Sequence, residues 1–170
     1  MQTNYTILAQ VLLAGYVLLF VLAAVNDVRR YRIPNVVVVA LVVLFVPAAL
    51  CTRTDVPWLS HFGAAAVILC AGAVAFYYRI LGAGDVKLLT AAALWAGFAH
   101  LGDLLLCTAI LGGALALLLS GLRYSLVLAT SHVGPKWVDK LPSLLMPGAA
   151  VPYGVAIAAG AIWIGFATAA

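Results

Sequence analysis

The residues best suited to chemistry are two aspartates, each placed where a long apolar run meets a polar turn. Asp27 follows the first apolar run, and Asp85 closes the stretch Gly82-Ala83-Gly84-Asp85 between two further runs. An Asp at the centre of a membrane helix costs about 2.5 to 3.5 kcal/mol, and less near the interface, so its default interpretation is functional. Because glycine allows unusual backbone conformations, the two glycines predict an unwound, open entry into the following helix.

Two carboxyl groups at similar depth are typical of general acid and base catalysis. If Asp27 and Asp85 approach within hydrogen-bonding reach, they cannot both ionise readily, and the pair shares one proton. The ionised member can take a proton from a water molecule that attacks a peptide carbonyl, while the protonated member donates to the carbonyl oxygen. The pair therefore predicts aspartic peptidase chemistry that needs no metal.

The same residues also have structural interpretations, and the sequence alone leaves both open. Asp85 could only cap the helix that follows it. Asp27 and Asp85 could equally be unrelated interfacial charges near Arg29 and Lys87. Lys87 could orient Asp85 or a substrate carboxylate, or simply extend its ammonium group towards the interface.

The composition predicts an all-α integral membrane protein. Of the 170 residues, 66% are hydrophobic and 8% are charged, whereas soluble domains carry about 25% charged residues. A membrane-spanning helix needs about 20 residues, so the chain has room for about six with short loops. We therefore expect one membrane domain over residues 1–170, with no separate soluble or methyltransferase domain. The apolar runs are too long for the strands of a membrane barrel.

Six apolar runs predict the helices that position these side chains. Their expected bounds are residues 6–25, 35–50, 61–78, 86–100, 104–122 and 151–167. A short link at Gly102 and Asp103 is expected between the fourth and fifth helices. Whether the fifth extends through residues 124–129 stays open. Residues 131–147, the longest polar segment, predict either a short interfacial helix or a plain loop.

The distribution of Lys and Arg predicts the orientation in the membrane. Eight of the nine basic residues fall in the segments after the first, third and fifth expected helices, which lie on one side. The positive-inside rule makes that side cytoplasmic, so both termini are expected outside. The formal net charge of +4 fits anionic lipid headgroups and requires no nucleic acid.

This topology separates the five aspartates. Asp27 and Asp85 lie at the cytoplasmic ends of apolar helices. Asp55 and Asp103 fall on the outer side, where capping or solvation accounts for them. Asp139 lies between two lysines in the polar segment, which favours a solvated ion pair.

Metal and disulfide chemistry have no support in the sequence. The cysteines form no C-x-x-C pair and the three histidines do not cluster; the cysteines are Cys51, Cys70 and Cys107. We therefore expect no metal site, no cofactor and no disulfide framework.

Three short blocks resemble the type IV prepilin peptidase family. Gly-x-Gly-Asp alone is shared with other intramembrane aspartyl proteases, but the three blocks in this order and spacing are much more specific. The resemblance spans nearly the whole chain. In its short length, the chain is similar to the peptidases of tight-adherence (Flp-type) pili. The blocks are Asp27 with Arg32-Ile33-Pro34-Asn35, then Gly82-Ala83-Gly84-Asp85-Val86-Lys87, and finally Val151-Pro152-Tyr153-Gly154-Val155-Ala156.

The resemblance implies a protease of the GxGD type in the bacterial inner membrane. Its catalytic pair would be Asp27 and Asp85. Its expected substrates are prepilin and pseudopilin-like precursors, which lose a short basic leader after a glycine at the cytoplasmic face. The supporting residues of the motifs would be Gly82, Gly84, Lys87, Pro34 and Asn35.

The chain differs in one respect from longer members of the family. Longer family members carry a cytoplasmic insertion with paired cysteines and also N-methylate the new terminus. Residues 27–35 leave no room for that insertion, so we do not expect methylation.

The competing class is a non-enzymatic membrane subunit, a scaffold or a small transporter. A proton pathway would need acids at mid-membrane depth, and none of these aspartates is expected there. The sequence names neither the pilin precursor nor the oligomeric state.

Overall fold

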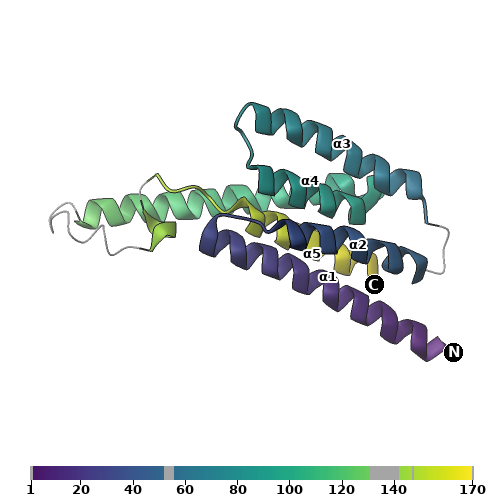
Figure 1. Ribbon diagram of the computed structural model, residues 1–170. Coiled ribbons are helices and arrows are strands. Elements are labelled where there is room, and N and C mark those ends of the chain that lie inside the picture. Colours follow the sequence, from purple (N-terminus) through teal and green to yellow (C-terminus); the bar gives the residue numbers. More distant parts are fainter. Residues whose placement is uncertain (1, 52–55, 131–141, 147, 170) are drawn as a thin grey trace.

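A computed structural model describes residues 2–51, 56–130, 142–146 and 148–169 (Figure 1). The described residues form five α-helices and one short 3-10 helix, so the prediction of an all-helical protein is confirmed. The helices are α1 (Gln2–Arg30), α2 (Asn35–Cys51), α3 (Trp58–Tyr77), α4 (Ala83–Thr130), η2 (Ser143–Leu145) and α5 (Tyr153–Ala169).

Three of these helices are long and apolar enough to cross a membrane: α1 over Ile7–Arg30, α3, and α4 over Ala83–Leu128. α2 and α5 have 17 residues each. At 1.5 Å per residue they reach about 26 Å, which is at the lower limit of length for a membrane-spanning helix. The prediction of about six membrane-spanning helices is therefore not confirmed, because only three of the described helices qualify by length and composition.

The break predicted at Gly102 and Asp103 is wrong, because α4 is helical there. The backbone instead leaves helical geometry at Gly97, with φ 63° and ψ 180°. This region is essentially restricted to glycine. The chain reverses direction at this point (Figure 1), so α4 consists of a first arm, residues 83–96, and a second arm, residues 98–130. The extension through residues 124–129, which the sequence left open, is helical.

Other boundaries differ from the expected ones in ways that affect the two aspartates. α1 continues to Arg30, so Asp27 lies inside its last turns rather than after its end. α4 begins at Ala83, so Gly84 is already helical and the predicted unwound entry is restricted to Gly82. Residues 131–141 lie outside the described residues, and with them most of the predicted interfacial helix. The 3-10 helix η2 is the helical part described in this segment.

The core of the bundle holds α1 and α5 side by side. α5 packs against both α1 and α4, and α3 packs along α4. The buried Tyr16 hydroxyl of α1 donates a hydrogen bond to the Ala161 carbonyl of α5 at 2.6 Å. A row of buried alanines on α4, Ala91 to Ala93 and Ala96, allows close helix approach. These contacts bring the end of α1 next to the start of α5.

Candidate active site

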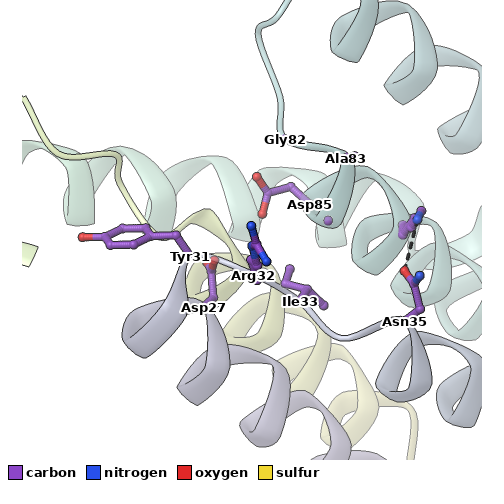
Figure 2. A pocket seen from close by; sticks show the side chains of 10 residues that line it. Asp27, Tyr31, Arg32, Ile33, Asn35, Gly82, Ala83 and Asp85 are labelled. Carbon is purple, nitrogen blue, oxygen red and sulfur yellow. Dashed lines mark hydrogen bonds between the residues drawn. The ribbon is translucent and has the colours of Figure 1, made fainter. Parts of the chain in front are cut away.

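A cavity of about 270 Å³ lies where α1 ends and where α2 and α4 begin (Figure 2). Six of the seven site residues predicted from the sequence line it. Pro34 is the exception, and its carbonyl accepts a hydrogen bond from Val37 N–H at 3.1 Å as α2 begins. The lining residues are Asp27, Tyr31, Arg32, Ile33, Asn35, Gly82, Ala83, Gly84, Asp85 and Lys87.

Asp27 is held by the first turn of α5. Its side chain is 6% exposed, which makes it the one buried charged residue in the described part of the chain. Its Oδ2 accepts a hydrogen bond from the Gly154 backbone N–H at 2.7 Å. Gly154 is the second residue of α5, where N–H groups have no partner within the helix and the helix dipole is positive. Both effects favour the ionised form of the Asp27 carboxyl group, and burial of the side chain opposes them.

Only glycine fits at position 154. A Cβ there would lie 2.7 Å from Asp27 Oδ2 and 3.0 Å from its Cγ, so any side chain would displace the carboxyl group. Sequence reasoning noted Gly154 as part of a motif but assigned it no role. Gly154 and Asp27 are 127 positions apart, and no local sequence pattern connects them.

Asp85 occupies the third position of α4 and closes its first turn. The Gly82 backbone hydrogen-bonds to the Asp85 carboxyl group, and the Gly82 carbonyl accepts from Val86 N–H at 3.1 Å. This contact is one half of a capping box, in which a side chain at the third position returns to the cap residue; Gly82 has no side chain that could supply the other half. Asp85 thus makes a capping contact, as the structural interpretation expected, but from the third position of α4 rather than from the cap position, and the same side chain also lines the cavity.

The two carboxyl groups share one environment. Asp85 is partly buried, and Asp27 is close enough to affect it electrostatically. In Figure 2 both side chains lie at the same cavity, Asp27 from the end of α1 and Asp85 from the start of α4. Two carboxyl groups in different surroundings at one cavity are suited to general acid and base chemistry on a small bound molecule.

The supporting residues join the three elements around the cavity. A Cβ on Gly84 would lie 3.3 Å from Ile33 Cβ, so the absence of a side chain lets α4 pack closely on the connection between α1 and α2. Lys87 Nζ donates to Asn35 Oδ1 at 3.1 Å (Figure 2). This exposed hydrogen bond links α4 to the first residue of α2.

The remaining acidic residues lie apart from this cavity or outside the described residues. Asp103, on the second arm of α4, is 68% exposed and lies 3.8 Å from the His100 ring nitrogen. Asp55 and Asp139 lie outside the described residues. Among residues 2–51, 56–130, 142–146 and 148–169, no group of three His, Cys, Asp or Glu side chains could hold a metal ion.

Comparison with known protein families gives a match that covers more than half of the chain. The model of the type IV leader peptidase family matches residues 13–117, which include α1 from residue 13, all of α2 and α3, and most of α4. No curated protein and no solved structure matches the chain. The matched region contains Asp27, Asp85 and every residue that lines the cavity, whereas α5 lies outside it.

Proposed function

Because the chain belongs to the type IV leader peptidase family, we propose that it is an aspartic endopeptidase that removes the leader peptide from type IV prepilins. Membership of the family makes it a protease whose substrates are prepilins, and its apolar helices fit an inner-membrane protein. The observation that carries the aspartic mechanism is the meeting of Asp27 and Asp85 at one cavity. No cofactor enters this chemistry.

The surroundings of the two carboxyl groups favour different roles for them. Asp27, ionised beside the N-terminus of α5, takes a proton from the attacking water. The water oxygen bonds to the peptide carbon, and the proton carried by Asp85 passes to the carbonyl oxygen. When the tetrahedral intermediate collapses, the C–N bond breaks and the leaving nitrogen receives the proton that Asp27 took up. As the new carbonyl forms, a hydroxyl group of the intermediate gives its proton to Asp85, so both carboxyl groups regain their original charges.

The substrate subclass and the orientation are part of the proposal. Only four residues, 31–34, connect α1 to α2, which favours the short Flp-type enzymes over longer members with a cytoplasmic insertion. α1 ends in Arg29 and Arg30, and Lys87 borders the cavity. By the positive-inside rule we infer that this end faces the cytoplasm. Prepilin and pseudopilin-like leaders would then be cut at the cytoplasmic face, and both termini of the enzyme would lie outside.

Co-expression with a prepilin tests this function. Wild-type protein is expected to produce a leader-sized mobility shift in the prepilin, and Asp27→Asn and Asp85→Asn are each expected to abolish it. Asparagine has nearly the same shape as aspartate but cannot exchange the required proton. Asp103→Asn removes an exposed carboxylate of the same helix as Asp85 and serves as the matched control. Normal cleavage by either single variant, at equal membrane levels, would refute the catalytic assignment.

A further inference from the structure

Arg123, on the second arm of α4, is bound by backbone carbonyl groups. Its Nε and Nη2 donate to the Leu144 carbonyl at 3.1 and 2.9 Å. Its Nη1 donates to Ala149 O at 2.7 Å, and Nη2 also donates to Ala150 O at 3.1 Å. A guanidinium group presents five donors in a rigid plane, so one side chain fixes three points of the backbone.

Those three points lie in the segment that leads into α5. Leu144 belongs to η2, and Ala150 comes four residues before Gly154, whose N–H binds Asp27. The same arm of α4 holds the start of α5 at a second place, since a Cβ on Gly112 would lie 2.9 Å from the Tyr153 ring. The second arm thus contacts the start of α5 at two places: through the hydrogen bonds of Arg123 and through the close packing of Tyr153 on Gly112.

We propose that Arg123 is a positioning residue for Asp27. By holding the backbone at residues 144, 149 and 150, it sets where α5 begins, and so where the Gly154 N–H meets the Asp27 carboxylate. Arg123 does not reach the reacting atoms and acts through the first turn of α5. Its kinetic effect rests on the proposed function, whereas its effect on the Gly154 hydrogen bond can be measured separately.

The competing explanation is that Arg123 serves only as a positive charge on the second arm of α4. Arg123→Lys separates the two explanations, because lysine keeps the charge and loses the planar fork. Tyr124→Ala is the matched control: Tyr124 is the next residue on the same arm, and its side chain is 67% exposed.

The first measurement is independent of peptidase activity. In the full-length protein in lipid nanodiscs, with ¹⁵N-labelled glycine, the Gly154 amide resonance is identified by its loss in Gly154→Ala. We expect Arg123→Lys to shift this resonance as the hydrogen bond to Asp27 lengthens, and Tyr124→Ala to leave it in place. An unchanged Gly154 resonance in Arg123→Lys overturns the proposal.

The second measurement is the rate of leader cleavage on a co-reconstituted prepilin. Arg123→Lys is expected to lower kcat about tenfold with KM unchanged, because misplacing a catalytic group by a fraction of an ångström affects the chemical step. Combined with Gly154→Ala it should cost little beyond Gly154→Ala alone, since both changes act through one hydrogen bond. Costs that multiply would mean a general structural role and overturn the proposal. If even the wild type leaves prepilin uncut, the proposed function fails, and the Gly154 resonance still decides the role of Arg123.

Discussion

Replacing Gly154 by alanine is a direct test of how Asp27 is held. The new Cβ would lie 2.7 Å from Asp27 Oδ2, whereas ordinary van der Waals contact begins at 3.4 Å. The carboxyl group or the first turn of α5 must therefore move by at least 3.0 − 2.7 = 0.3 Å, and by 3.4 − 2.7 = 0.7 Å to reach an ordinary contact. Misplacing a catalytic group by about 1 Å can cost about 100-fold in rate, so we expect kcat to fall about 10- to 100-fold.

The assay is steady-state leader cleavage by purified protein in lipid, with a defined prepilin as substrate. Gly160→Ala is the control in the same helix. Its Cβ would meet Thr108 Oγ1 at 2.8 Å, a similar steric conflict, but Thr108 does not line the cavity. We expect Gly160→Ala to lower the thermal stability and to leave kcat within about twofold of wild type. Wild-type kcat in Gly154→Ala would show that the contact between Gly154 and Asp27 has no part in the reaction.

The remaining predictions concern the dyad, the reversal in α4 and the absence of a metal. In a long incubation that detects residual cleavage, the double variant Asp27→Asn/Asp85→Asn should be no slower than either single variant, because groups that act as a unit are not additive. A further loss of this residual rate in the double variant would contradict the prediction. Gly97→Ala should lower the free energy of unfolding by about 1 to 3 kcal/mol, because alanine is strained at φ 63°. Gly102→Ala should leave the free energy of unfolding unchanged, because the space around Gly102 is open. Equal unfolding midpoints for the two variants in detergent would refute the strain argument. Cleavage by purified protein should continue in strong chelators, and a loss that zinc restores would refute a mechanism based on carboxyl groups alone.

The location of the site could be predicted because it depends on short-range patterns. Asp27 and Asp85 each follow an apolar run. Because a carboxylate in a membrane is energetically costly, both were identified as candidate functional residues. The structure brings both to one cavity, together with Gly82, Gly84, Asn35 and Lys87. The bounds of α2 were predicted within one residue, because Pro34 and Asn35 mark its start clearly.

The contacts that complete the site could not be predicted, because they join distant parts of the chain. The hydrogen bond between Gly154 and Asp27 depends on α5 packing beside α1, and the hydrogen bonds of Arg123 depend on the path of residues 142–150. The reversal in α4 was misplaced for a different reason. The polar pair Gly102 and Asp103 suggested a turn, but Asp103 is simply exposed on a continuous helix. The residues next to Gly97 form no sequence pattern that predicts its non-helical backbone conformation.

The order in which the chain is made gives the contact between α1 and α5 a further consequence. Synthesis runs from the N-terminus, so both aspartates leave the ribosome long before Gly154, which follows Asp27 by 127 positions. A nascent chain without α5 already holds Asp27 and Asp85 but lacks the donor that stabilises the Asp27 carboxylate. If Asp27 has the role proposed for it, we expect proteolytic activity only once the last helix has docked against the rest of the bundle.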